Sequence, residues 1–398
     1  MLELLPPPPT DPLWDLTYEF GSDERAERLN LVLGVYRDHT GRTPVMAAVR
    51  EAEIRLAERS ESKEYRGLSG NAAFNRALLT LVLGDTGPQG PAGRAAAVQT
   101  VAGSGALRLL ADLICRTRPG ATVWISDPAY VNHRPILEAA GLEVRTYGWR
   151  DAEGRFDAAG VLRDLAAAGR DDVVLLQGCC HNPTGVDPEP EDWEALAALA
   201  ARDGWVPFVD LAYHGLGDGL EADLRATRLL AERVPEMLIA VSCSKNFGLY
   251  SDRTGCAIVL GASERAVRHA ETALQNAART LYSMPPEHGA AVVTAVLEDE
   301  GLRALWRAEL DAMRGRIEAN RTSLAAELAE LGWGAQAASL ARQRGMFSML
   351  PLTPEEMLLL RRQYAIYGTT AGRINIAGIE SGRIPCLARG VAGVLAGR

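Results

Sequence analysis

The sequence lacks the features that mark secreted, membrane-spanning and metal-binding proteins. Its 398 residues include six cysteines, and no two of them form a CxxC pair. The adjacent Cys179 and Cys180 are expected to be small buried side chains rather than metal ligands. The N-terminal MLELLPPPPT has no basic start or signal-length apolar core, and no apolar run is long enough to cross a bilayer. We therefore expect a cytoplasmic protein with reduced cysteines.

Positive charge is also scarce, which bears on the partners of the chain. The chain has 42 Lys and Arg against 51 Asp and Glu, a formal net charge of −9. Such a balance does not favour a nucleic-acid partner, because phosphate backbones bind to basic surfaces. A small anionic ligand remains compatible, since a local pocket can be positive on an acidic protein.

Helices and short apolar runs alternate along most of the chain. Helical periodicity covers residues 44–60, 71–83, 104–116, 191–202 and 224–233. Runs typical of β-strands cover residues 122–126, 143–147, 173–178, 206–210, 238–242 and 256–260. This alternation predicts an α/β fold with a largely parallel sheet.

A proline run near the N-terminus and a long helix in the C-terminal third complete the predicted organisation. Pro6 to Pro9 cannot be helical, and this extended arm either crosses a neighbouring subunit or frays. An apolar stripe predicts one long helix that bridges two domains, formed by Leu302, Leu305, Leu310, Met313, Ile317, Leu324 and Leu328. We expect residues 1–44 to form an arm and part of a small domain, 45–305 a large domain, and 306–398 the small C-terminal domain, which ends in a helix from about residue 384.

Polar residues follow several of the predicted strands. They are Asp127, Tyr130, His181, Asn182, Asp210, Tyr213, Ser242, Ser244 and Lys245. In parallel α/β sheets, ligands bind beyond the carboxyl ends of the strands. These side chains are therefore expected to converge on one cleft.

Lys245 is either a solvated loop charge or a site residue. Its neighbours include the hydroxyls of Ser242 and Ser244, and Arg253 follows eight residues later. Hydroxyls and a guanidinium suit the phosphate of a bound cofactor. Partial desolvation near positive charge would favour the neutral amine, which is nucleophilic toward a carbonyl.

Three further segments each allow a purely structural and a functional interpretation. The Gly103-Ser104 pair before a predicted helix is either an ordinary turn or an anion site at the start of a helix. Asp210 is either a cap or core ion-pair residue, or an acid that faces a cofactor. The segment HNPTG is a turn by composition, and Asn182 within it is a candidate to point into the cleft.

Taken together, these segments resemble the aspartate/aromatic aminotransferases, which are fold type I enzymes that depend on pyridoxal 5′-phosphate (PLP). The motifs are most similar to those of the bacterial aromatic amino acid branch of this family. The matching pieces are LNLVLGVYRDHTGRTPVM, EYRGLSG, GSGALR, WISDPAYVNHRPI, GCCHNPTG, PFVDLAYHGLGDGLE, SCSKNFGLYSDRTG, YSMPPEHGA, RGMFS and GRINIAG. They follow the family's order from about residue 29 to residue 378. The resemblance implies a mostly parallel seven-stranded sheet in a large PLP-binding domain and a smaller α+β domain.

The resemblance also implies roles around the cofactor. Lys245 would form the Schiff base and move the proton, while Asp210, supported by His133, would pair with the ring nitrogen. Asn182 and Tyr213 would hydrogen-bond the phenolic oxygen, and Tyr130 would stack on the ring. The phosphate would be held by Gly103, Ser104, Ser242, Ser244 and Arg253, with Tyr65 from the neighbouring subunit.

Substrate contacts follow from the same resemblance. Arg373 would bind the α-carboxylate, and Arg279 of the neighbour would meet a distal carboxylate. Gly34, Phe347, Tyr130 and Asn182 would line the substrate pocket. The implied assembly is a homodimer with shared active sites that acts on amino acids and 2-oxo acids, with no nucleic acid, membrane or metal.

The chain departs from the family pattern at several positions near the site. Tyr130 replaces a tryptophan, Gln177 a histidine behind Asp210, and Ser104 a threonine. His214, Leu216 and Met284 replace glutamine, phenylalanine and asparagine. The Lys, Asp and Arg framework is intact, so these changes bear on the substrate and on the outcome of the reaction.

We therefore predict a PLP-dependent aminotransferase that works by a ping-pong mechanism through Lys245. One alternative is a repurposed PLP enzyme of specialised metabolism that carries out β- or γ-elimination, replacement or carbon–carbon bond formation. Another is a non-catalytic binding or regulatory protein on the same fold. The complete set of Lys245, Asp210 and Arg373 favours an enzyme over the non-catalytic protein.

Overall fold

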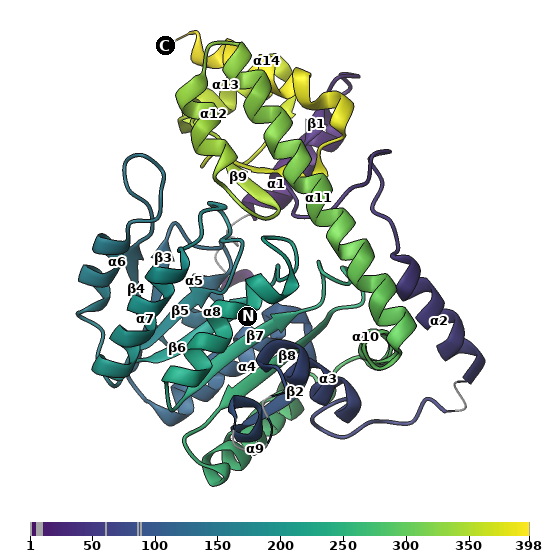
Figure 1. The fold of residues 1–398 in the computed structure, drawn as a ribbon, viewed down its shortest axis with the longest axis vertical. Coiled ribbons are helices and arrows are strands. Elements are labelled where there is room, and N and C mark those ends of the chain that lie inside the picture. The colour runs from purple at the N-terminus through teal and green to yellow at the C-terminus, as the bar shows by residue number, and fades with distance from the viewer. Residues whose placement is uncertain (1, 5–10, 60–61, 86, 88–89, 398) are drawn as a thin grey trace. The chain divides into compact units, whose positions relative to one another are not determined.

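The computed structural model describes residues 2–4, 11–59, 62–85, 87 and 90–397. The proline segment at residues 6–9 lies outside the described residues, so its extended form stays a prediction. Internal contacts divide the chain into two units (Figure 1). The large unit comprises Pro44–Asn182 and Val186–Gly315, and the small unit comprises Met1–Thr43, Pro183–Gly185 and Arg316–Arg398.

A seven-stranded sheet forms the centre of the large unit. Its strands are β2 (Ala95–Val101), β3 (Thr122–Asp127), β4 (Glu143–Gly148), β5 (Val173–Gln177), β6 (Val206–Leu211), β7 (Met237–Ser242) and β8 (Thr254–Leu260). The order is β2-β8-β7-β6-β5-β3-β4. Only β8 is antiparallel to its neighbours, which confirms the predicted α/β fold with a largely parallel sheet.

Strong burial of the central strands explains their continuous apolar sequences. Every residue of β5, β6 and β8 is buried, as expected for strands covered on both faces. Asp210 in β6 and Gln177 in β5 interrupt these apolar runs near the carboxyl ends of their strands. Polar residues at such buried positions point to a role beyond the core.

Helices cover both faces of this sheet, and the direction of the crossovers changes within it. The helices of the large unit are α2 (Ala47–Arg59), α3 (Ala72–Leu83), α4 (Ala102–Thr117), α5 (His133–Ala139), α6 (Ala158–Leu165), α7 (Pro190–Asp203), α8 (Leu220–Arg233), α9 (Glu264–Leu281) and α10 (Glu287–Glu298). Helices α4, α5 and α9 pack together on one face, while α6, α7 and α8 follow one another on the other (Figure 1). Successive strands are added toward one edge of the sheet up to β4 and toward the other edge from β5 onward, so the order reverses between the neighbouring parallel strands β3 and β5. Such a switch point opens a crevice at the carboxyl ends of the strands.

The small unit combines helices with two short strand pairs. Its elements are the 3₁₀ turn Leu2–Leu4, α1 (Pro12–Ser22), β1 (Leu29–Asn30), α12 (Gly334–Ala341), β9 (Phe347–Met349), α13 (Pro354–Tyr364), β10 (Ile366–Tyr367), β11 (Arg373–Asn375) and α14 (Ile384–Leu395). Strand β1 pairs in parallel with β10, and β9 pairs antiparallel with β11. Among the described residues, no helix is both long and apolar enough to cross a bilayer.

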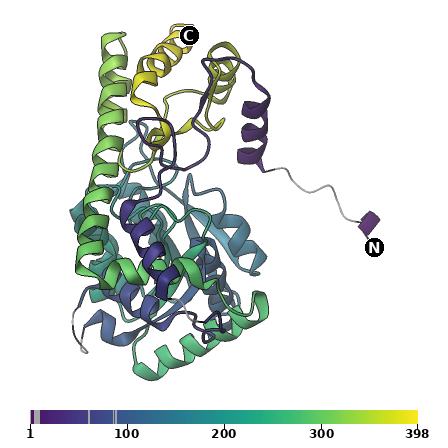
Figure 2. The ribbon, with the colours of Figure 1, turned by 90° about the vertical axis from the view of Figure 1, so that its right-hand side faces the viewer.

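Helix α11 (Glu300–Glu330) is a single helix of 31 residues (Figure 2), as the apolar stripe predicted. The prediction that Leu305 belongs to this buried stripe was wrong, because Leu305 is 39% exposed. The adjacent Trp306 is fully buried instead. The steps from Leu302 to Trp306 to Leu310 are four residues each, so Trp306 occupies the inward position of that turn.

Candidate active site

One cavity of about 80 Å³ collects the polar residues that follow the strands of the large unit. It is lined by Ala102, Gly103, Ser104, Leu107, Tyr130, Gln177, Asn182, Asp210, Ala212, Tyr213, Ser242, Ser244, Lys245 and Arg253. Every residue of the large unit that we predicted to contact the cofactor is present except Tyr65. The cavity also includes Gln177, which we noted in the sequence only as a replacement for histidine. The other additional lining residues are Ala102, Leu107 and Ala212, whose small or apolar side chains gave no functional signal in the sequence.

Lys245 and Tyr213 face each other within this cavity. The Nζ atom of Lys245 lies 5.4 Å from the centre of the Tyr213 ring. The side-chain amide of Asn182 donates a hydrogen bond of 3.2 Å to the Tyr213 hydroxyl. An amine, a phenol and an amide from the ends of three different strands therefore converge on one space.

Asp210 provides a carboxylate at the end of β6. Its Oδ2 lies 2.9 Å from Nε2 of His133, a buried residue at the start of α5. This is the contact that the resemblance implied for His133. The Tyr130 ring meets the His133 ring edge-on at 5.2 Å between centres, so His133 contacts both a cavity wall and the acid.

Gln177 fixes the backbone of Asn182. Its amide donates to the Asn182 carbonyl at 2.9 Å, and its side-chain oxygen accepts from the Asn182 N–H at 2.8 Å. Gln177 also pairs with Asp210 in the β5–β6 register. The sequence singled out Gln177 only as a replacement for histidine, whereas the structure shows that it holds an adjacent cavity residue in place.

A polar corner of the cavity forms where α4 begins. Ala102 and Arg253 both adopt left-handed backbone angles, with φ of 57° and 56°, and the Ala102 N–H donates to the Arg253 carbonyl at 2.8 Å. Such strained residues persist where the surrounding structure holds them, often at ligand sites. A side chain at Gly103 would place its Cβ 2.9 Å from the Cβ of Ser242. The first turn of α4 thus lies close to hydroxyls and a guanidinium, a set of donors that suits phosphate.

His181 supports the loop that carries Asn182. Its Nε2 lies 2.9 Å from the Ser126 hydroxyl, and its ring stacks on Trp149 at 4.2 Å between centres. Complete burial lowers the pKa of His181 well below its usual value. This imidazole is therefore neutral and serves as a fixed packing surface beneath the loop.

Cys179 and Cys180 are buried, as expected for small core residues. Their sulfur atoms and a carboxylate oxygen of Asp223 all lie within 4.8 Å of one another. The Asp223 carboxylate already accepts backbone N–H bonds of 2.8 to 2.9 Å from Gly215, Gly217 and Asp218. Asp223 therefore fastens the loop after Tyr213, and its burial raises its pKa to about 6.

The predicted substrate residues of the small unit lie together within that unit. Arg373 is buried and donates a hydrogen bond of 2.8 Å to the Val32 carbonyl. Its guanidinium lies 4.4 Å from the centre of the Phe347 ring. A Cβ on Gly34 would come within 2.5 Å of the same ring, so glycine is required beside Phe347.

Tyr65 and Arg279 do not line the cavity of their own chain. Tyr65 is 90% exposed. Arg279 is an exposed residue in the last turn of α9, and its guanidinium donates to the Ser283 hydroxyl at 3.1 Å. The roles implied for both residues in a neighbouring subunit stay predictions.

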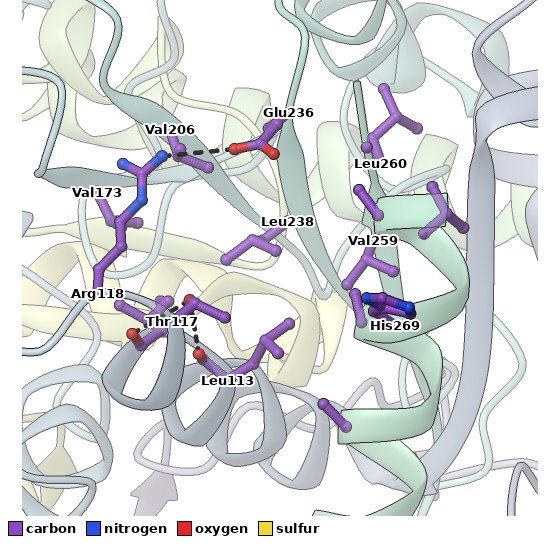
Figure 3. A pocket seen from close by; sticks show the side chains of 16 residues that line it. Leu113, Thr117, Arg118, Val173, Val206, Glu236, Leu238, Val259, Leu260 and His269 are labelled. Carbon is purple, nitrogen blue, oxygen red and sulfur yellow. Dashed lines mark hydrogen bonds and ion pairs between the residues drawn. The ribbon is translucent and has the colours of Figure 1, made fainter. Parts of the chain in front are cut away.

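A larger cavity of about 400 Å³ lies at the opposite ends of the strands, between α4 and α9 (Figure 3). Aliphatic side chains such as Leu238 and Val259 form most of its lining. The charged groups Arg118 and Glu236 form an ion pair of 3.4 Å there. Lys245, Asp210 and the serine hydroxyls that distinguish the smaller cavity do not line this one.

The arrangement of the smaller cavity agrees with comparisons to known proteins. The family model for aminotransferase class I and II matches residues 26–391. The chain belongs to the class I and II aminotransferases. The aromatic-amino-acid aminotransferase of Paracoccus denitrificans is 44% identical over 392 residues, which are 98% of this chain and 99% of that protein. The aspartate aminotransferase of Escherichia coli K12 is 40% identical, over 99% of this chain and 100% of that protein.

A solved structure supports the same assignment for this aminotransferase. The aromatic-amino-acid aminotransferase from Burkholderia pseudomallei, covalently bound to pyridoxal phosphate, superposes with a TM-score of 0.95 at 36% identity and covers 99% of each chain. The predicted fold type I architecture and the predicted transaminase activity are both confirmed. These full-length matches do not favour the alternatives of elimination, replacement or carbon–carbon bond formation.

Proposed function

We propose that this aminotransferase uses PLP, held through Lys245, to exchange amino groups between an amino acid and a 2-oxo acid in a ping-pong cycle. The observation that carries the proposal is the 5.4 Å approach of the Lys245 amine to the Tyr213 ring, inside a cavity that also contains Asp210 and Arg253. The similar Burkholderia protein, whose structure is covalently bound to pyridoxal phosphate, supports the choice of cofactor.

The residues of the cavity fit the parts of PLP by their chemistry. The first turn of α4, with Ser242, Ser244 and Arg253, supplies donors for the phosphate. Asp210 supplies a carboxylate for a protonated ring nitrogen, and Asn182 with Tyr213 supplies donors for the phenolic oxygen. When bound, the cofactor offers an aldehyde that exchanges one amine for another and a ring that accepts electrons from the substrate.

The protein residues then have separate tasks. Lys245 would hold the cofactor through its aldehyde, and its amine would serve as the general base for the proton on the substrate Cα. Asp210, held by His133, would face the ring nitrogen and favour its protonated form, which would stabilise negative charge on the ring. Asn182, held by Gln177, keeps its amide directed at the Tyr213 hydroxyl.

We propose aromatic and dicarboxylic amino acids as substrates, the classes named for the similar Paracoccus and Escherichia coli enzymes. Arg373 binds the α-carboxylate as a bidentate pair. Arg279 binds the distal carboxylate of a dicarboxylic substrate. Gly34, Phe347 and Tyr130 contribute the walls of the substrate pocket.

The proposed assembly is a homodimer in which each chain completes the site of the other. Tyr65, exposed in the single chain, contacts the phosphate bound to a second copy, and Arg279 serves the substrate of that copy. Exposed aromatic side chains are characteristic of surfaces that become buried on association.

The proposed function is tested by mixing the PLP-loaded protein with glutamate and phenylpyruvate. We expect equal amounts of phenylalanine and 2-oxoglutarate, measured by chromatography, and none from a Lys245→Ala variant. Release of ammonia without formation of phenylalanine would show that the amino group is eliminated rather than transferred.

A further inference from the structure

We infer that His214 and Asn246 form a bridge that positions Lys245 against Tyr213. Neither residue lines the cavity, and their contact is not implied by the motifs that identify the family. The inference rests on the proposed function of Lys245 and assigns positioning residues to it.

The bridge joins the two loops that carry the facing side chains. Tyr213 follows β6 and Lys245 follows β7, and these parallel strands pair as far as Leu211 and Val241. Beyond that point, a 2.8 Å contact links Nε2 of His214 and Nδ2 of Asn246. Each partner is the residue directly after a site residue, so the contact ties together the loops beyond the end of the sheet.

Burial makes this hydrogen bond costly to lose. His214 and Asn246 are both fully buried. Burial lowers the pKa of His214 to about 4, so the ring is neutral near pH 7 and its Nε2 accepts from the Asn246 amide. A buried amide left without its acceptor pays the full penalty of desolvation.

Both ends of the bridge are fastened independently. On one side, the Asn246 carbonyl accepts a 2.7 Å bond from the Trp306 indole, and the Phe247 and Trp306 rings stack at 4.5 Å and 5°. On the other side, the Gly215 N–H donates to the buried Asp223 carboxylate at 2.8 Å. The bridge therefore connects two loops that are each held by the core of the large unit.

This arrangement predicts an effect on catalysis beyond stability. The amine of Lys245 must reach both the cofactor aldehyde and the substrate Cα, and small displacements of a reacting group are costly. Neither residue of the bridge lines the cavity, so loss of the bridge should lower kcat more than it changes KM. It should also alter the environment of the amine bonded to the cofactor, which is visible in the absorbance of the bound cofactor.

The test uses the PLP-loaded protein and three variants. His214→Leu removes the acceptor, His214→Gln keeps a side-chain oxygen for Asn246, and His214→Leu with Asn246→Leu removes both polar groups. For His214→Leu we expect kcat to fall by about tenfold, KM to change by less than about threefold, and the pH midpoint of cofactor absorbance to move by about half a unit. His214→Gln should stay within about twofold of the parent.

The double variant separates positioning from stability. Removing both partners leaves neither side of this contact unpaired, so the thermal stability of the double variant should recover relative to His214→Leu, while kcat and the absorbance midpoint remain altered. A double variant that regains the parental kcat and midpoint would overturn the inference. This variant also supplies the answer if His214→Leu does not fold.

Tyr147→Phe is the matched control, because it removes another buried hydrogen bond, from the Tyr147 hydroxyl to the Leu175 carbonyl. It should lower stability and leave the absorbance midpoint unchanged. Borohydride labelling of the parent at Lys245 is recorded first. An unlabelled parent would contradict the proposed function, whereas a labelled parent with unaltered bridge variants would contradict the bridge alone.

Discussion

At the scale of single residues, a substitution at Asp210 tests whether a negative charge beside the ring of the proposed cofactor contributes to catalysis. Asp210→Asn keeps the size of the side chain beside His133 and removes its charge. We expect kcat to fall by about 10²- to 10³-fold, because a fixed charge that stabilises the developing negative charge is lost. Steady-state kinetics measure this loss. Glu236→Gln, an acid-to-amide change in the other cavity, should leave kcat unchanged, and an Asp210→Asn variant with the parental kcat would contradict the role.

Arg279 tests the proposed choice of substrate. Arg279→Ala should raise KM for aspartate and glutamate by at least about tenfold, because a charge-assisted hydrogen bond to the distal carboxylate is lost. KM for phenylalanine should change little. Kinetics with these three substrates give the comparison. Equal losses for dicarboxylic and aromatic amino acids would remove Arg279 from this role.

The sequence predicted the residues that line the cavity better than those that support them. Lys245, Asp210 and Arg253 could be found because they lie at or near the ends of strands and belong to recognisable motifs. The contact between His214 and Asn246 joins residues 32 positions apart, and no periodicity encodes such a pairing. Leu305 was placed inward because it is apolar, but the helical phase set by Trp306 turns it toward solvent.

At the scale of elements, strand β2 shows where composition misleads. Its sequence AAAVQTV is rich in alanine, which is depleted in strands, so no strand was predicted there. Pairing of all seven residues with β8 overrides that weak local preference. The predicted helices and the other six strands of the sheet, by contrast, lie within a few residues of their observed positions, because their apolar periodicity matches their burial.

The contact between the loops after β6 and β7 predicts a pH dependence of stability. Burial lowers the pKa of the folded His214 to about 4, from an ordinary value of 6.5. As the pH falls from 7 to 5, the unfolded chain gains a proton there that the folded chain does not, so the free energy of unfolding decreases. His214→Gln lacks this group and should lose about 2 kcal/mol less over that interval.

Urea unfolding of the parent and of His214→Gln at pH 7 and pH 5 measures this difference. Other buried groups, including Asp223, are present in both proteins, so their contributions cancel in the comparison. An equal loss of stability in the two proteins would show that His214 does not titrate as its burial indicates.

At the scale of the whole molecule, the shared site predicts complementation between inactive chains. In a hybrid of Tyr65→Ala and Lys245→Ala chains, one site contains both Lys245 and Tyr65 if Tyr65 acts on the other copy. Mixing the two variants after mild unfolding and refolding should therefore raise activity above the sum of the separate variants. No gain in hybrids isolated with two different affinity tags would contradict the exchange of Tyr65.

The sequence predicted the fold class of the whole molecule but not the order of its strands. Alternating helices and strands were sufficient for an α/β fold, because that pattern has few packing solutions. The order of the strands and the reversal between β3 and β5 depend on the directions of the crossovers, which local sequence does not specify. That reversal is what brings Tyr130, Asn182 and Asp210 from separate strands to one crevice.

The proposed mechanism depends on a bond between the Lys245 amine and the aldehyde of PLP. Borohydride reduction of the PLP-loaded protein, followed by digestion and mass spectrometry, tests it most directly. We expect a pyridoxyl group fixed on the peptide that contains Lys245. A stable label on another lysine, or no label on a protein that retains its cofactor, would contradict it.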